Sequence, residues 1–284
     1  MTVRVVTDST ADLPAEVAAE AGIVVVPCQV IFGTAAYREG VDITTKEFYE
    51  RLVSSTALPT TSQPPVGDFV RTYAQLAEEG ATAIVSVHLA SAFSGVYATA
   101  SMAAQQTSVV EVAVIDSGTT TLGLGLLALE AAAQCTAGRS LADVAQSVTR
   151  AVSRVRLLAL LDTLSYIRAG GRINRLAELL GTLLDIKPIL EFHGGDIIPL
   201  ERVRTRRRAV RRLVERVQEL GPIQRMGIAH AAAPALAEEL VARLSAHFPG
   251  NDLLIVEAGA VLGTHVGPGA VGVACLLAEK DSDD

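Results

Sequence analysis

Hydroxyl side chains recur where apolar runs of the sequence end. Four clusters of this kind occur: Thr7–Ser9, Thr60–Gln63, Ser91–Gly95 and Asp116–Ser117. In an open parallel sheet, ligands bind outside the carboxyl ends of the strands, where loops lead into helices whose free N–H groups attract an anion. The clusters therefore predict a ligand site built from hydroxyl and backbone N–H groups. Each single Ser or Thr can equally be an ordinary helix cap.

One histidine stands apart from the other four. His265 lies in the segment Gly263–Gly269, whose glycines allow another group to approach the backbone closely, so His265 is a candidate ligand contact. The carboxylates Asp8, Asp12 and Asp116 are assigned instead to a helix cap and to loop hydrogen bonds. The five histidines show no metal-ligand spacing, and no metal site is predicted.

Arginines are concentrated in one short segment of the second half. Eight lie between Arg202 and Arg216, and only Glu201 and Glu215 oppose them there. The members are Arg202, Arg204, Arg206, Arg207, Arg208, Arg211, Arg212 and Arg216. Apolar residues recur in this segment at helical spacing, which predicts a helix whose arginines mostly face water. The arginines then form either a solvated face or a docking surface for an acidic partner or a phosphate group. Arg172, beside a glycine pair, adds to this cationic content.

Composition narrows the possible classes of protein. The chain has 284 residues, of which 50% are hydrophobic, and this excludes disorder as its main state. Aromatic residues make up 4% and the net charge is −7, which argues against a nucleic-acid partner. Three well-separated cysteines indicate a reducing compartment. No targeting segment is visible, and the uncharged segment Gly259–Ala278 is predicted to be a buried strand with a glycine-rich loop. We therefore expect a soluble cytoplasmic protein without stable membrane insertion.

Several enzyme signatures are missing from the sequence. None of the three lysines closes a phosphate-binding loop, and no Gly-x-Ser-x-Gly elbow occurs. The glycines of Gly123–Ala128 imitate a dinucleotide fingerprint, but they begin seven residues after Asp116 instead of directly after the strand. No cofactor is expected.

The pattern of elements predicts an α/β protein in two parts. In the first half, short apolar strands such as Val3–Val6 and Ala83–Val87 alternate with helices, which favours a parallel sheet covered on both faces. In the second half, Ile189–Phe192 and Ile197–Leu200 flank Gly194-Gly195 and predict a hairpin. We place the boundary near residue 155, between an N-terminal parallel α/β domain (1–155) and a C-terminal α+β domain with a mixed or antiparallel sheet (156–284).

Six motifs in this order are similar to those of one known family. They are Val6–Pro14, Thr61–Pro64, Ser94–Tyr97, Asp162–Ile173, Val203–Arg206 and Gly263–Gly269. Through them the chain resembles the DegV family of bacterial fatty-acid-binding proteins over nearly its whole length. It departs from the family pattern at Pro65, Ala90 and Val96.

The resemblance implies that one long-chain fatty acid is held between the two domains. The carboxylate would be bound by Thr61, Ser62, Ser94 and the backbone of Gly95, with His265 nearby. Relatives act as acyl carriers for a fatty acid kinase, which phosphorylates the bound carboxylate for lipid synthesis. In that scheme the chain is not itself the catalyst. Its docking surface for the kinase would be formed by four arginines: Arg172, Arg202, Arg204 and Arg206.

The physical chemistry of such a ligand is consistent with these residues. Burial of one methylene contributes about 0.8 kcal/mol, and hydroxyl and N–H donors offset the cost of dehydrating a carboxylate. Two alternatives remain open at this point. One is an enzyme acting on a phosphorylated or acyl substrate through Asp8, Ser9 and Asp116, and the other is an RNA-binding module that uses the arginine-rich helix.

Overall fold

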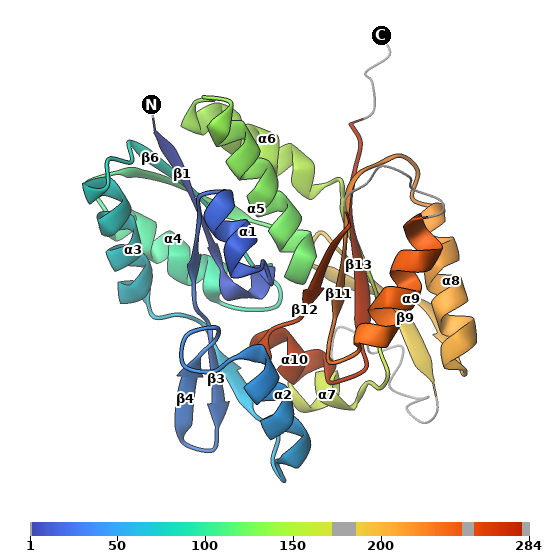
Figure 1. Ribbon diagram of the computed structural model, residues 1–284. Helices are drawn as coiled ribbons and strands as arrows, with labels where there is room; N and C mark the ends of the chain where they lie inside the picture. The colour runs from blue at the N-terminus through green and yellow to red at the C-terminus, as the bar shows by residue number, and fades with distance from the viewer. Residues whose placement is uncertain (1, 172–185, 246–252, 280–284) are drawn as a thin grey trace.

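A four-stranded parallel sheet organises the first part of the chain. The computed structural model describes residues 2–171, 186–245 and 253–279. The sheet has the order β2-β1-β6-β7, and all its strand pairs are parallel, as predicted. Its strands are β1 (Val3–Asp8), β2 (Ile23–Val26), β6 (Ala83–His88) and β7 (Glu111–Asp116). Helices cover both faces, α3 (Val66–Glu78) and α4 (Val96–Gln106) on one side, and α5 (Thr121–Thr136) and α6 (Leu141–Val152) on the other (Figure 1).

A six-stranded mixed sheet organises the second part, which confirms the predicted fold class. Its order is β10-β9-β8-β13-β11-β12, and only the β11–β12 pair is parallel. The strands are β8 (Val155–Leu160), β9 (Lys187–His193), β10 (Asp196–Val203), β11 (Ile223–His230), β12 (Leu254–Glu257) and β13 (Val271–Leu277). The predicted β9–β10 hairpin is present, with positive φ at Gly194 and Gly195. Helices α8 (Arg206–Gln218) and α9 (Pro234–Ser245) cover its outer face.

A small antiparallel sheet, which the sequence did not predict, joins these two parts. It consists of β3 (Gln29–Phe32), β4 (Ala35–Arg38) and β5 (Thr60–Ser62), in the order β4-β3-β5. Helix α2 (Thr45–Ser54) lies between β4 and β5 in sequence and begins with a capping box of Thr44 and Glu47. This sheet is what positions Thr61.

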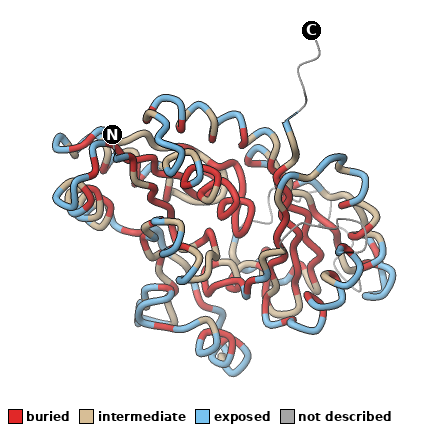
Figure 2. Tube along the Cα trace, turned by 45° about the horizontal axis from the view of Figure 1, so that its top comes forward, coloured by how far each residue is buried: buried red, intermediate tan, exposed pale blue. Residues whose placement is uncertain are grey.

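Helix α5 lies between the two large sheets and is buried along most of its length (Figure 2). Its residues are apolar on all sides, as expected for a helix that packs on both sides. Three shorter elements come before β9 in the described chain: η1 (Ser9–Ala11), α1 (Ala15–Glu20) and α7 (Ser165–Ala169).

The segment predicted as a buried strand with a glycine-rich loop contains a helix as well. Helix α10 (Ala260–Val266) comes first, a glycine-containing turn follows, and β13 then supplies the predicted strand. The helix forms here because Asp12 accepts a hydrogen bond from the Gly259 N–H (2.9 Å) and Glu39 accepts one from the Val261 N–H (2.8 Å). These caps come from residues more than 200 positions away, which a local pattern does not reveal.

Candidate ligand-binding site

A cavity lies between the two large sheets and takes its lining from both parts of the chain. It has a volume of about 80 Å³ and is partly open to solvent. Its polar lining residues are Thr10, Thr61, Ser94, Thr120 and His265. Its apolar lining residues are Leu89, Phe93, Ile167, Phe192, Ile197, Val261, Leu262 and Val266. A pocket with a few polar groups and a mostly apolar wall is typical of small-molecule sites.

The polar groups of the cavity come from three distant segments. Thr61 lies on β5, Ser94 lies just before α4, and His265 lies on α10. The Thr61 hydroxyl and His265 Nε2 are 2.9 Å apart and hydrogen-bonded. The Ser94 hydroxyl lines the cavity and makes no hydrogen bond to another described residue. Three of the five predicted site residues therefore share one cavity.

The other two predicted residues lie beside this cavity and not in its lining. Ser62 is exposed, and its hydroxyl donates to the Gln63 carbonyl (3.2 Å). Gly95 is the N-cap of α4, which has no side-chain cap, so the first N–H groups of that helix are available to an anion. The Gln63 side chain lies over Gly95 so closely that a Cβ there would collide with it. Thr61–Gln63 and Ser94–Gly95 thus form one contiguous surface.

A glycine also sets the position of the His265 ring. A Cβ built on Gly170, at the end of α7, would collide with His265 Nδ1. The ring therefore lies against the Gly170 backbone on one side and bonds Thr61 on the other. Glycine at this position allows the close approach that the sequence motif alone left unexplained.

Buried Asp8 holds the loops that carry the site. Its carboxylate accepts hydrogen bonds from His88 (2.9 Å) and from the Leu89 and Thr10 N–H groups (3.0 and 3.1 Å). Burial raises the pKa of Asp8, but these donors outweigh burial and leave the pKa below its usual value. Because Leu89 and Thr10 both line the cavity, Asp8 fixes two of its walls, in agreement with the predicted role in loop hydrogen bonds.

The three residues of the enzyme alternative are all committed to structural hydrogen bonds. Asp8 is fully buried. Ser9 donates to Glu39 (2.5 Å) and accepts from the Cys28 N–H (2.9 Å). Asp116 accepts from the N–H groups of Ser91 and Gly118, as the sequence predicted for a loop carboxylate. None of the three lines the cavity.

Two carboxyl groups, from partly buried Asp12 and buried Glu39, cap the helix that carries His265. Burial, reinforced by repulsion from Glu39, raises the pKa of Asp12 to about 8. Burial also raises the pKa of Glu39. At neutral pH Asp12 is therefore largely protonated, which lets two carboxyl groups share the N-terminus of α10.

A second, mostly apolar cavity lies beside the first. It has a volume of about 30 Å³ and shares Thr120, Phe192, Leu262 and Val266 with the first cavity. No Lys, Arg, Asp or Glu lines either of these two cavities within the described chain. The first cavity combines hydroxyl groups and an imidazole with a mostly apolar wall, which suits an amphiphile with a small polar head.

The two cavity walls contain residues that sequence reasoning missed. On α10, His265 and Val266 follow Leu262 by three and four residues, which is the spacing of one helical face. The sequence analysis treated this segment as a strand and loop and therefore did not use that signal. Phe93 and Phe192, whose rings meet edge to face at 5.9 Å in the cavity wall, gave no sequence signal, because Phe93 lies in the loop before α4 and Phe192 lies on β9, about 100 residues later.

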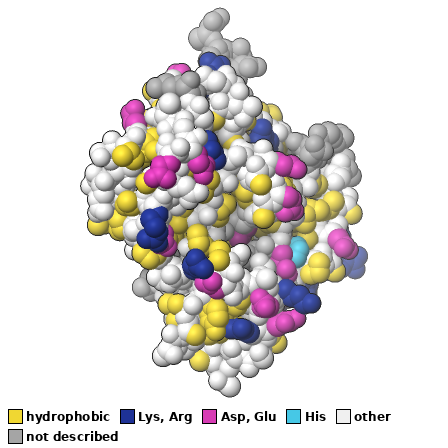
Figure 3. Space-filling view, turned by 60° about the vertical axis from the view of Figure 1, so that its left-hand side comes forward, with side chains coloured by type: hydrophobic (Ala, Val, Ile, Leu, Met, Phe, Trp, Pro, Cys, Tyr) yellow, Lys and Arg dark blue, Asp and Glu magenta, His cyan; other side chains and the backbone are white. Residues whose placement is uncertain are grey.

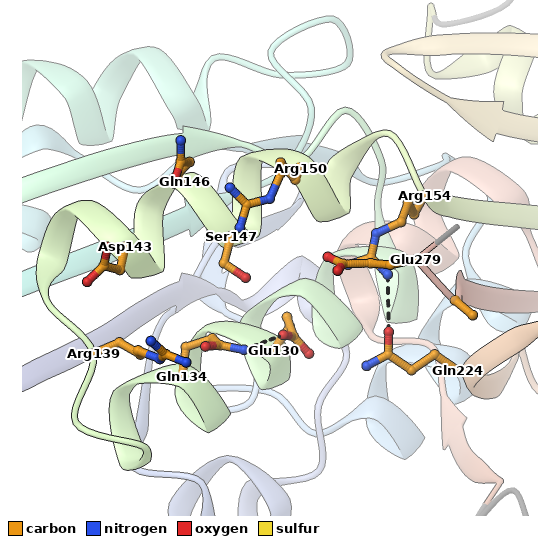
Figure 4. Close-up of a pocket in the computed structure, with 11 residues that line it drawn as sticks. Glu130, Gln134, Arg139, Asp143, Gln146, Ser147, Arg150, Arg154, Gln224 and Glu279 are labelled. Carbon is orange, nitrogen blue, oxygen red and sulfur yellow. Dashed lines mark hydrogen bonds and ion pairs between the residues drawn. The ribbon is translucent and has the colours of Figure 1, made fainter. Parts of the chain in front are cut away.

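A polar groove between α5, α6 and the end of β13 is a separate feature (Figure 4). Three arginines and three acids line it, so its formal charge is balanced. Arg154 is already bonded there to Gln224 (3.1 Å), the Leu277 carbonyl (2.6 Å) and Glu279 (3.2 Å). We interpret this groove as a solvated surface. Basic and acidic side chains are likewise interspersed on the face shown in Figure 3.

The arginine-rich segment divides into two groups. Arg212 and Arg216 are bound to Glu201 of β10 and therefore stabilise the packing of α8. Arg204 and Arg206 are exposed and make no ion pair with another described residue. Arg202 is exposed on β10, and Arg172 lies outside the described residues.

Among residues 2–171, 186–245 and 253–279, no group of three or more His, Cys, Asp or Glu side chains is placed to hold a metal ion. In the same ranges, no helix has both the length and the apolar content needed to cross a membrane.

Comparison with known proteins agrees with this architecture and decides the family. The model of the DegV family, described as uncharacterised proteins, matches residues 2–278. The chain belongs to the DegV family. A DegV domain-containing protein of Streptomyces coelicolor is 39% identical over 275 residues, covering 95% of this chain and 97% of that protein.

Solved structures of DegV proteins share the fold over almost the entire length. A DegV family protein from Thermus thermophilus, described in terms of its fatty acid binding, superposes with a TM-score of 0.90 at 30% identity, covering 98% of this chain and 100% of that one. DegV of Bacillus subtilis, described as a fatty acid binding protein, also gives 0.90, at 36% identity and with coverage of 97% and 99%.

Proposed function

We propose that this DegV chain binds one long-chain fatty acid between its two domains, 1–155 and 156–284, and needs no other cofactor. The observation that carries this proposal is the cavity in which Thr61, Ser94 and His265 meet a mostly apolar wall. The fatty acid binding described for the Thermus and Bacillus relatives supports it.

The carboxylate binds at the polar end. Ser94 and Thr61 donate hydroxyl hydrogens, and the N–H groups that begin α4 at Gly95 add the positive end of the helix dipole. The exposed hydroxyl of Ser62 completes the surface around the head group. With no Lys or Arg in the described lining, the carboxylate keeps its nucleophilic oxygen instead of being neutralised by a fixed cation.

That chemistry fits a carrier that presents its ligand to another protein. The proposed partner is a fatty acid kinase, which would phosphorylate the carboxylate of a bound acid such as palmitate, as a step toward phospholipid synthesis in the cytoplasm. The partner would dock on the exposed Arg202, Arg204 and Arg206, and on Arg172. The chain would not be the catalyst in this scheme.

The binding proposal is tested by substitution at the head group. Ser94→Ala should weaken palmitate binding by roughly 10- to 100-fold, because a hydrogen bond to a charged group contributes about 1.5–3 kcal/mol. Isothermal titration measures the affinity, and circular dichroism checks the fold. The matched control is Ser91→Ala, in the same loop but outside the cavity lining. Equal affinities of the two variants would remove Ser94 from the site, and a delipidated wild type that takes up no fatty acid would refute the proposal.

The docking proposal needs a separate readout. Charge reversal at Arg204 and Arg206 should weaken coupling to the kinase and leave fatty acid affinity unchanged. The control is charge reversal at Arg243 on α9, which is already paired with Glu239. Loss of fatty acid binding in the first variant, or equal kinase coupling in both, would contradict a separate docking surface.

A further inference from the structure

The two hydroxyl groups of the polar site stand on elements that belong to different sheets. Thr61 lies on β5, which pairs with β3 in the small antiparallel sheet. Ser94 lies just before α4, a helix that covers the parallel sheet. A carboxylate that accepts hydrogen bonds from both segments needs them at a fixed separation, because binding groups must be held within about 0.5 Å of their productive geometry. Some contact must therefore hold β5 against the start of α4.

The Gln63 side chain makes this contact. Its Nε2 donates a hydrogen bond to the Thr99 hydroxyl of α4 at 3.1 Å. Within residues 2–171, 186–245 and 253–279, this is the one hydrogen bond that joins residues 60–63 to residues 91–99. Gln63 is exposed, whereas Thr99 is buried in the packed face of α4. The Gln63–Thr99 hydrogen bond thus fastens a surface segment to a fixed point of the core.

The other bond of Thr99 determines which way the Gln63 amide points. The Thr99 hydroxyl donates to the Gly95 carbonyl one turn earlier, at 3.0 Å. Because its hydrogen is committed there, the Thr99 oxygen must accept from Gln63, and the amide nitrogen must face Thr99. The amide oxygen lies over Gly95, where it is the atom closest to a Cβ built on that residue.

Packing against Gly95 holds the same amide from a second side. A Cβ on Gly95 would lie 2.9 Å from both Cδ and Nε2 of Gln63, which is closer than packed side chains approach. The amide therefore occupies the space that any larger residue at position 95 would fill. The next residue, Pro64, disfavours a helical backbone at Gln63 and so limits the directions that its side chain can take.

We propose that Gln63 is a positioning residue of the carboxylate site, which keeps Thr61 and the first turn of α4 at the separation that lets both bind one carboxylate. This inference rests on the proposed function, because it assigns the residue that aligns the donors of that site. Gln63 itself does not line the cavity, and it acts through Thr99 and Gly95. Loss of the Gln63–Thr99 hydrogen bond leaves every donor present but frees the two segments to move apart.

The experiment compares palmitate with hexadecanol, which has a tail of the same length and no carboxylate. Gln63→Ala and Thr99→Val each remove one partner of the hydrogen bond. Each should weaken palmitate binding by about 3- to 10-fold, the effect of one neutral hydrogen bond. The affinity for hexadecanol, measured by the same titration, should keep its wild-type value, because a positioning effect acts on the carboxylate alone.

Three further variants sharpen the comparison. Thr99→Ser keeps the hydroxyl and should restore wild-type binding of palmitate. The double variant of Gln63→Ala and Thr99→Val should bind palmitate about as weakly as either single variant, since both substitutions break the same bond. The matched control is Gln75→Ala, an exposed glutamine of α3 whose amide donates to Glu79 (2.9 Å) outside the cavity lining. This control should keep the wild-type affinity for both ligands.

The outcomes separate this inference from the proposed function. Wild-type palmitate affinity in both single variants, or additive losses in the double variant, would overturn the inference and leave the proposed function standing. An equal loss of palmitate and hexadecanol would also overturn it, because the hydrogen bond would then support only the fold. No uptake of palmitate by the delipidated wild type would overturn the proposed function as well.

Discussion

Replacement of Asp12 by Asn tests whether a protonated acid caps the His265 helix. Burial and the nearby Glu39 raise the pKa of Asp12 to about 8, from an ordinary value of 3.8. The folded state thus holds a proton that the unfolded chain releases above its own pKa. The free energy of unfolding should therefore fall as the pH rises through this window, by at most about 1.4 kcal/mol per pH unit.

The structure makes Asn a suitable replacement. Asp12 Oδ1 accepts from the Gly259 N–H at 2.9 Å, and the amide oxygen of Asn can accept the same bond. Asn cannot ionise, so the variant loses the contribution of this residue to the pH dependence. Between pH 5 and pH 7, the variant should gain about 2–3 kcal/mol of stability relative to the wild type.

Urea unfolding of both proteins at several pH values between 5 and 7 measures this difference. The control is Asp42→Asn. Arg38 holds the pKa of exposed Asp42 down to about 2, so the contribution of Asp42 to the free energy of unfolding is lost only when the pH falls through the acid range. That variant should therefore change the slope very little between pH 5 and pH 7. A slope for Asp12→Asn equal to that of the wild type would refute the reasoning, since it would mean that Asp12 is ionised in the folded protein.

Two further predictions concern contacts near the site. Gly170→Ala places a methyl group against the ring of His265, so it should break the hydrogen bond between His265 and Thr61. The variant should bind fatty acid more weakly, with little change in melting temperature. An unchanged affinity, measured by titration, would contradict this prediction. Tyr49→Phe removes the buried bond from the Tyr49 hydroxyl to the Ala258 carbonyl (2.9 Å) and should cost about 1–3 kcal/mol of unfolding free energy, measured by denaturant titration. Full retention of stability would show that water replaces the lost donor.

Local features of this protein could be predicted because their causes lie within a few residues. The parallel strands β1 and β6 were predicted from the apolar runs Val3–Val6 and Ala83–Val87. The Gly194-Gly195 pair predicted the hairpin because two residues with positive φ suffice to turn the chain. The family motifs further led to Thr61, Ser94 and His265 as candidates.

Contacts between segments that are distant in the sequence could not be predicted from local patterns. Helix α10 forms where a strand and loop were expected, because Asp12 and Glu39 supply its caps from the other end of the chain. The small sheet that positions Thr61 depends on pairing between β3 and β5, which are separated by a helix.

The sequence by itself determined the fold class, the family and three residues that meet in one cavity. Tertiary structure decided which groups touch and where space remains. Ala159, Ala229 and Gly272 look like ordinary small residues until the strand register puts them in one row. The physical reason is that an amino-acid pattern records the periodicity of a single element, whereas a cavity depends on the alignment of several elements at once.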